Sequence, residues 1–97
     1  MNTQPTHHRK LNVQNAHIMA GALDAELAID RLVALGFTVL RVEIEGLRPV
    51  IWIQACRRCR ELGGAWYRRE SSSAGVEFTW QAALCGCQIR WKTKGDA

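Results

Sequence analysis

The sequence predicts an α+β domain in which one or two N-terminal helices pack on an antiparallel sheet of four to five strands. The chain has 97 residues, the length of a single domain, and 47% of them are hydrophobic, which argues against general disorder. Before Gly36 the hydrophobic residues follow the spacing of a helix. After Gly36 they alternate residue by residue, as in strands. This change of period indicates helices followed by a sheet.

The N-terminal part predicts two helices separated at Gly21. Asn12 can cap a short helix over residues 13–20, which Gly21 would end. Asp24 is a suitable N-cap for a longer helix, and Gly36 stands where the residue after a helix end is expected. The buried face of this second helix would consist of Ala28, Leu32 and Leu35, with Leu27 beside them.

The remainder of the chain predicts a sheet. In residues 37–45, Leu40, Val42 and Ile44 alternate with charged side chains, and residues 50–54 are expected to pair back as a hairpin. Gly86 would mark a turn or bulge before the last strand. A short helical connection is expected over residues 55–62, and the later strands over residues 65–70, 76–84 and 88–92.

The domain is expected to span residues 11–92, between a flexible basic tail over residues 1–10 and a loose tail over residues 93–97. No apolar run is long enough for a membrane helix, and the polar start lacks the hydrophobic region of a secretory signal. We therefore expect a soluble, cytoplasmic protein that has no membrane partner.

Positive charge is concentrated in the second half of the chain. The net charge is +4, and residues 48–97 carry nine basic and four acidic side chains, against four and five in residues 1–47. Such a split suggests a face for phosphates or for an acidic protein surface. A solvated surface that merely keeps the protein in solution is the alternative.

Four tryptophans fall on the predicted strands. Trp52 and Trp80 have strongly apolar neighbours, which favours the core for both. By alternation, Trp66 should share a face with Arg68, and Tyr67 with Arg69. Aromatic rings interleaved with arginines suit single-stranded nucleic acid or a protein interface. The candidate binding residues are Arg57, Arg58, Arg60, Trp66, Tyr67, Arg68, Arg69, Arg90, Trp91 and Lys92.

The cysteines form a C-x2-C pair, Cys56 and Cys59, and a C-x-C pair, Cys85 and Cys87. Four thiolates are the ligand set of a structural zinc site. The C-x-C spacing counts against zinc, because residues i and i+2 of an extended strand lie about 7 Å apart. The pattern favours reduced buried thiols and no cofactor. Structural zinc at all four cysteines is the first alternative, and disulfides or thiol exchange at Cys56 and Cys59 are less favoured.

No catalytic arrangement is recognisable in the sequence. His7 and His8 lie in the expected tail, and His17 lies on the short helix. The serines at positions 71–73 lack the strand–turn–helix context of a nucleophile elbow. The sequence therefore predicts a protein that is not an enzyme.

Two segments, Gly36-Phe37-Thr38-Val39-Leu40 and Gly86-Cys87-Gln88-Ile89-Arg90-Trp91, resemble small uncharacterised accessory proteins of proteobacterial phages, prophages and plasmids. Pro49, Cys59, Leu62 and Gly64 add to the resemblance, which covers residues 11–92. The resemblance implies no catalytic residues. It implies a phage-borne protein that binds and disables a host machine, as anti-CRISPR proteins do.

The leading hypothesis is thus a non-enzymatic binding protein that inhibits a host protein or nucleoprotein complex. The runner-up is a zinc-stabilised module that binds nucleic acid directly. The two hypotheses differ in the expected salt dependence, since phosphate contacts release counterions. A homodimer remains open in both.

Overall fold

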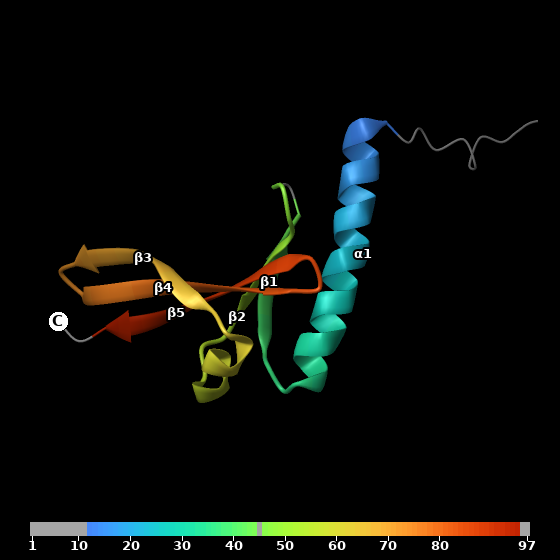
Figure 1. Ribbon diagram of the computed structural model, residues 1–97. Helices are drawn as coiled ribbons and strands as arrows, with labels where there is room; N and C mark the ends of the chain where they lie inside the picture. The colour runs from blue at the N-terminus through green and yellow to red at the C-terminus, as the bar shows by residue number, and fades with distance from the viewer. Residues whose placement is uncertain (1–11, 45, 96–97) are drawn as a thin grey trace, which may run out of the picture.

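A single helix begins the fold in the computed structural model, which describes residues 12–44 and 46–95. The expected tail over residues 1–10, with His7 and His8, lies outside the described residues, as does Glu45. The helix α1 (Val13–Ala34) is followed by β1 (Val39–Glu43), β2 (Val50–Ile53), the 3-10 helix η2 (Arg57–Leu62), β3 (Ala65–Ser72), β4 (Gly75–Leu84) and β5 (Cys87–Gly95). The five strands form one sheet, and the fold is α+β (Figure 1).

The predicted break at Gly21 is wrong, because α1 runs through it. Asn12 is the N-cap, as expected, and its side-chain oxygen accepts a hydrogen bond from the backbone N–H of Asn15 at 2.7 Å. Gly21 is buried, and a Cβ there would lie 2.7 Å from Cγ2 of Ile44. This glycine lets the helix approach the chain that follows β1. Asp24 lies in the helix interior rather than at a cap.

The C-terminal end of α1 is as predicted. Gly36 has a φ of 91°, and its N–H donates to the carbonyl of Val33 while that of Phe37 donates to the carbonyl of Leu32. These two bonds form a Schellman motif. The buried side of α1 consists of Gly21, Ala25, Ala28 and Leu32, whereas Leu27, expected beside the core, is 61% exposed.

The sheet is mostly antiparallel, with strand order β1-β2-β5-β4-β3. β1 and β2 pair as the predicted hairpin, and β4 pairs antiparallel with both β3 and β5. The pair β2–β5 is parallel, which the sequence did not predict. Because β5 lies between β2 and β4, it joins the β1–β2 half of the sheet to the β3–β4 half.

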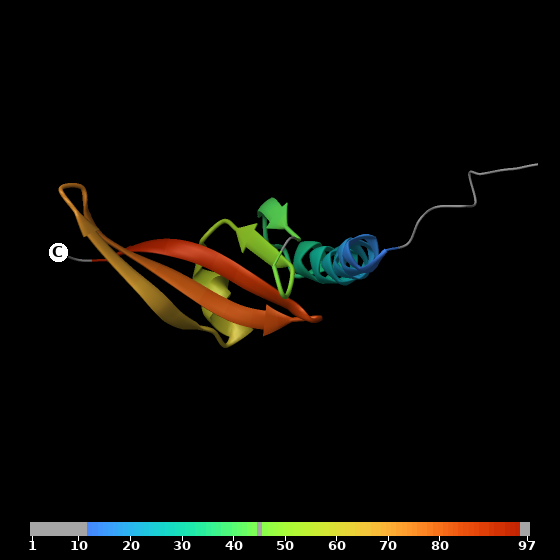
Figure 2. The ribbon, with the colours of Figure 1, turned by 90° about the horizontal axis from the view of Figure 1, so that it is seen from above.

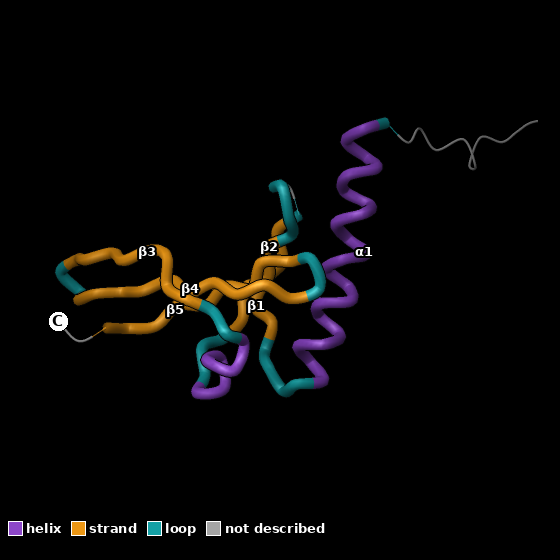
Figure 3. The backbone as a smooth tube through the Cα atoms, viewed as in Figure 1, coloured by secondary structure: helices purple, strands orange, loops and turns teal. Residues whose placement is uncertain are grey.

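One face of the sheet carries α1 and η2, and we call it the helix face. Its core joins residues of α1 with Ile51 and Ile53 of β2, Ile89 and Trp91 of β5, and Cys59 of η2. The strands β3, β4 and β5 extend away from α1 (Figure 2). Between α1 and this extension lies η2, drawn as the short purple segment in Figure 3. η2 therefore covers the middle of the sheet.

The last strand extends beyond its predicted end. Residues 93–95, assigned to a tail from the sequence, belong to β5. The indole N–H of Trp80 donates to Oγ1 of Thr93 at 2.8 Å, which fixes this part of the strand. The turn before β5 is as predicted: Cys85 and Gly86 have φ values of 52° and 77° between the paired residues Leu84 and Cys87. Two residues with positive φ are typical of a type I′ hairpin turn.

Candidate functional site

The face of the sheet opposite the helix face is covered by no described helix, and we call it the open face. Alternation decides which side chains it carries. Ile51 and Ile53 point into the core, so Trp52 between them points to the open face. Arg90 does the same between Ile89 and Trp91. The residues of the open face that matter below are Arg41, Trp52, Tyr67, Arg68, Gln81, Arg90 and Lys92.

Strand register brings four of these residues into one lateral row. Arg41 of β1 is paired with Trp52 of β2, Trp52 with Arg90 of β5, and Arg90 with Gln81 of β4. The guanidinium carbons of Arg41 and Arg90 lie 4.9 and 5.9 Å from the Trp52 ring centroid, and Nζ of Lys92 lies 5.6 Å from it. Three cations therefore surround one half-buried tryptophan, within the range of cation–π attraction.

Arg90 is held rigidly at the centre of the open face. Its Nε donates to Oε1 of Gln81 at 2.8 Å and its Nη2 donates to Oε1 of Gln88 at 3.0 Å. Its guanidinium carbon also lies 5.1 Å from the Tyr67 ring centroid. Both hydrogen-bond partners are neutral amides, and no ion pair within residues 12–44 and 46–95 involves Arg90. Its positive charge is fixed in place without being neutralised.

Three other cations of the open face each have an acidic neighbour. The ion pairs are Arg41–Glu43 at 3.0 Å, Arg68–Glu70 at 3.6 Å and Lys92–Glu77 at 3.8 Å. Exposed pairs of this kind contribute about 0–1 kcal/mol each. An anionic ligand can therefore replace the carboxylates at small cost.

The indole N–H of Trp52 is buried and has no hydrogen-bond partner in the part of the chain that the structure describes. An unsatisfied buried donor costs about 1–3 kcal/mol. A small cavity of about 220 Å³ lies next to this tryptophan, and its lining includes Arg41, Ala55 and Lys92.

A bulge in β3 overturns the predicted faces of its side chains. Trp66 is paired with Trp80, but Arg68 is paired with Thr79, so the register shifts at Tyr67. The extra residue places Tyr67 and Arg68 together on the open face, and returns Arg69 to the face of Trp66. Strict alternation predicted instead that Trp66 shares a face with Arg68, and Tyr67 with Arg69.

The ten predicted binding residues are divided among four places. Tyr67, Arg68, Arg90 and Lys92 lie on the open face. On the helix-face side lie Arg57 and Arg60 of η2 and Trp66 and Arg69 of β3. The side chain of Arg58, on η2, reaches the C-terminal end of α1, where it donates to the carbonyl of Leu35 and lies over the Phe37 ring. Trp91 is 4% exposed, and it stacks on Trp80 in the core rather than on a binding surface.

Trp66 is the most exposed tryptophan on the helix face. It is 51% exposed and meets Phe78 edge to face, with ring centroids 5.4 Å apart. Arg41, Trp52 and Gln81 are not among the binding residues predicted from the sequence, which favoured the core for Trp52. The signal that could have found Trp52 is its position between two isoleucines, since neighbours on a strand point to opposite faces.

The two cysteine pairs lie apart from each other. Cys56 and Cys59 are at the start of η2 beside Trp80 and Trp91, whereas Cys87 is four residues before Trp91, about 13 Å along an extended strand. No group of three or more His, Cys, Asp or Glu residues that could hold a metal is present among the described residues. A zinc site with all four thiolates would require the pairs to move together.

All four cysteines are free thiols, and each pair has one exposed and one buried member. Cys59 and Cys87 are the buried ones, so the expectation of buried thiols holds for half of them. Burial raises the pKa of Cys59 to about 11 and also raises the pKa of Cys87, where Asp24 and Cys85 add to the effect. Both buried thiols are therefore protonated at neutral pH.

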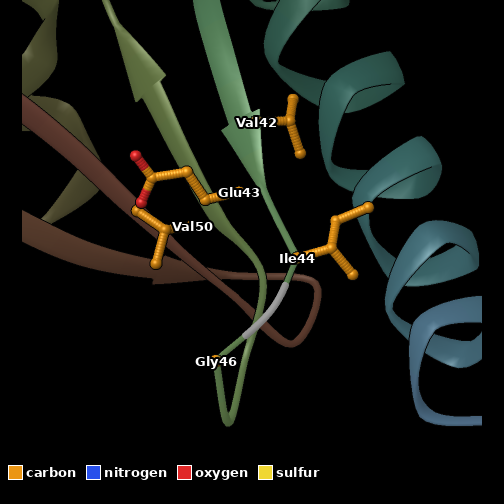
Figure 4. Close-up of a pocket in the computed structure, with 5 residues that line it drawn as sticks. All are labelled: Val42, Glu43, Ile44, Gly46 and Val50. Atoms are coloured by element: carbon orange, nitrogen blue, oxygen red, sulfur yellow. The ribbon is translucent and has the colours of Figure 1, made fainter. Parts of the chain in front are cut away.

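A cavity of about 680 Å³ lies at the β1–β2 turn and has little polar chemistry. Val42 and Ile44 project toward α1, while Glu43 projects to the other side (Figure 4). Glu43 is the one ionisable group among its described lining residues, and it is already paired with Arg41. Nearby, Nε2 of His17 donates to the carbonyl of Gly46 at 2.8 Å, which ties α1 to this turn. The cavity is thus a packing feature.

Comparison with known proteins adds a family but no activity. A family model described as an uncharacterised protein matches residues 5–94. No curated protein and no solved structure matches the chain. No helix of the described chain is both long and apolar enough to cross a membrane. The expected phage or plasmid origin stays a prediction.

Proposed function

The chain belongs to a family of uncharacterised proteins, and from the geometry of its sheet we propose that it binds single-stranded nucleic acid on the open face, without catalysis. The observation that carries the proposal is the row Arg41–Trp52–Arg90–Gln81, with Tyr67 against Arg90. Sheet faces that bind single strands combine aromatic rings and guanidinium planes, on which bases stack, with cations for phosphates.

Each component of such a surface has a candidate on the open face. The guanidinium carbons of Arg41 and Arg90 lie 4.9 to 5.9 Å from aromatic ring centroids, and guanidinium planes are groups on which bases stack. Lys92 and Arg68 supply charge for the backbone phosphates, because their weak ion pairs with Glu77 and Glu70 can open. A zinc ion is not needed for any of these contacts.

The direct test is the fluorescence anisotropy of a labelled oligothymidylate titrated with the protein at several salt concentrations. We expect binding that weakens steeply with salt, because each phosphate contact releases a counterion. Arg90→Ala should weaken binding about tenfold, since one stacked base contributes roughly 1–3 kcal/mol. Lys92→Ala should reduce the salt slope by about 1.

Arg31→Ala is the matched control, since Arg31 is an exposed arginine on α1 and its loss changes the net charge equally. Equal weakening by Arg31→Ala and Arg90→Ala would show that only net charge matters. The proposal would then be wrong, as it would be if the oligonucleotide did not bind at low salt.

A second candidate, inhibition of a host protein or nucleoprotein complex in an anti-CRISPR-like role, is favoured by Trp66. This side chain is half exposed, and Arg69 lies on the same face. Trp and Arg are the residues that most often dominate protein interfaces. A pull-down with and without nuclease separates the two candidate functions. A protein partner that stays bound after nuclease treatment and is lost with Trp66→Ala supports the inhibitor. Captured material that disappears after nuclease treatment supports nucleic-acid binding.

A further inference from the structure

The C-x2-C pair is built as an exposed thiol backed by a buried one. Cys56 precedes η2 as its N-cap, and Cys59 lies one turn later, which brings the two sulfurs within 3.8 Å. Cys59 is 2% exposed and is held by the backbone N–H of Cys56, which donates to its Sγ at 3.3 Å. Cys56 is exposed.

This separation is close to what a disulfide requires. The S–S bond is about 2.05 Å long, so the sulfurs must approach by less than 2 Å. A rotation of the exposed Cys56 side chain can supply most of that movement while Cys59 stays in the core. The backbone between them makes a single turn of η2 and need not unfold.

The surroundings of the pair suit a small anionic ligand. A cavity of about 200 Å³ beside the thiols is lined by Arg57 and Arg60 and by the stacked rings of Trp80 and Trp91. None of the ion pairs in the described ranges involves Arg57 or Arg60. Two guanidinium groups without an ion-pair partner, beside an exposed thiol, favour a ligand that carries carboxylates.

We propose that Cys56 and Cys59 form a dithiol site that exchanges with a small disulfide bearing carboxylates, of the class of glutathione disulfide. The thiolate of Cys56 attacks one sulfur of the ligand, whose S–S bond breaks and releases one ligand thiolate. Cys59 then loses its proton to solvent and attacks Sγ of Cys56 in the mixed disulfide, which releases the second ligand thiolate. The two protein thiols are oxidised to one disulfide, and one ligand disulfide is reduced to two thiols.

Intact-mass spectrometry of the reduced protein during incubation with glutathione disulfide tests the sequence of steps. The variant Cys85→Ser is used as the background, because Cys85 is the other exposed thiol. We expect a transient mixed disulfide, followed by an internal disulfide between Cys56 and Cys59. In this background, Cys59→Ala should stop the reaction at the mixed disulfide, and Cys56→Ser should prevent the mixed disulfide from forming.

The role of the two arginines is tested by replacing glutathione disulfide with cystamine, a disulfide that carries amines. The background protein should react several-fold faster with the anionic disulfide, and Arg57→Ala with Arg60→Ala should remove that preference. Since Cys59 is buried, far-UV circular dichroism checks the fold of each variant, and the arginine variants keep both thiols intact.

Two results would overturn the proposal. One is a mixed disulfide at Cys56 that never resolves while Cys59 is present. The other is that Cys85 in the wild-type protein reacts as fast as Cys56 and shows the same ratio of its rate with glutathione disulfide to its rate with cystamine. Exposure alone would then explain the reactivity of both thiols. Neither result bears on nucleic-acid binding, which uses residues of the opposite face.

Discussion

Gly63 and Gly64 show at the residue scale how two neighbouring glycines serve different purposes. Gly63 has a φ of 76° and ends η2, with open space where a Cβ would stand. At Gly64 a Cβ would collide with the backbone carbonyl of Gln81 and would lie 3.0 Å from the Trp91 ring. The first glycine supplies conformational freedom, and the second allows the chain between η2 and β3 to pass close to β4.

We predict that Gly64→Ala destabilises the protein more than Gly63→Ala does. The strained backbone at position 63 costs about 1–2 kcal/mol, while overpacking against a backbone that cannot move costs up to about 3 kcal/mol. Urea denaturation of both variants measures the difference. Equal losses would show that the chain around Gln81 can yield.

The buried thiol of Cys59 makes stability depend on alkaline pH. Its pKa is about 11 when folded, against a usual 9.0, so the folded state holds this proton more strongly. The stabilisation is complete below pH 9 and is lost as the pH rises toward 11, because ionisation favours the unfolded chain.

We expect the free energy of unfolding to fall by about 2–3 kcal/mol over this range, at 1.36 kcal/mol for each unit of pKa shift. Urea titrations at a series of pH values measure the decrease, and Cys59→Ala should show a smaller slope. A residual slope is expected from Cys87, whose pKa is also raised by burial. A decrease unchanged in Cys59→Ala would contradict the assignment.

At the scale of elements, close packing explains why α1 continues through Gly21. The glycine faces Ile44, whose Cγ2 would lie 2.7 Å from an added Cβ. Alanine is a better helix former by about 1 kcal/mol, so the glycine is retained for contact with the chain after β1 rather than to end the helix.

The contact predicts coupling between the two positions. Gly21→Ala should be destabilising alone, because Ile44 must move, but its cost should disappear or reverse in the presence of Ile44→Ala. A double-mutant cycle measured by urea denaturation gives the interaction energy. Simple additivity would mean that α1 and β1 separate freely at this point.

The bulges in β1 and β3 are the other element-scale feature. In β1 the register shifts between Val39 and Arg41, and Leu40 is 62% exposed, although alternation predicted it on the same side as Val42 and Ile44. In β3 the shift puts Tyr67 and Arg68 on one face. Alternation along one strand cannot reveal a bulge, because the extra residue is defined only against the neighbouring strand.

For the whole molecule, β5 determines how the two halves of the sheet depend on each other. It pairs with β2 on one side and β4 on the other, and its residues Ile89 and Cys87 are completely buried. The edge strand β3, in contrast, has all eight residues exposed. Protection against opening should therefore fall from β5 toward β3.

Hydrogen exchange of the backbone amides tests this gradient. We expect the slowest exchange in β2 and in the part of β5 around Ile89, at the level of global unfolding, and faster exchange in β3 by local opening. Uniform protection across all five strands would show that the sheet opens as one unit.

The sequence by itself determined the α+β class, the position of each strand, the cap at Asn12, the end of α1 at Gly36 and the turn at Gly86. These features depend on the spacing of hydrophobic residues and on local backbone preferences, both of which are set by residues close together in the sequence. The sequence also proposes Tyr67, Arg68, Arg90 and Lys92 as binding candidates, and the structure places these four on the open face, while their role in binding stays a prediction. The tertiary structure alone decided that Gly21 lies inside a helix, that β2 and β5 are parallel, and that Trp91 is buried. It also decided that Trp52 lies among Arg41, Arg90 and Lys92, because strand register and bulges arise from pairing between segments far apart in the chain.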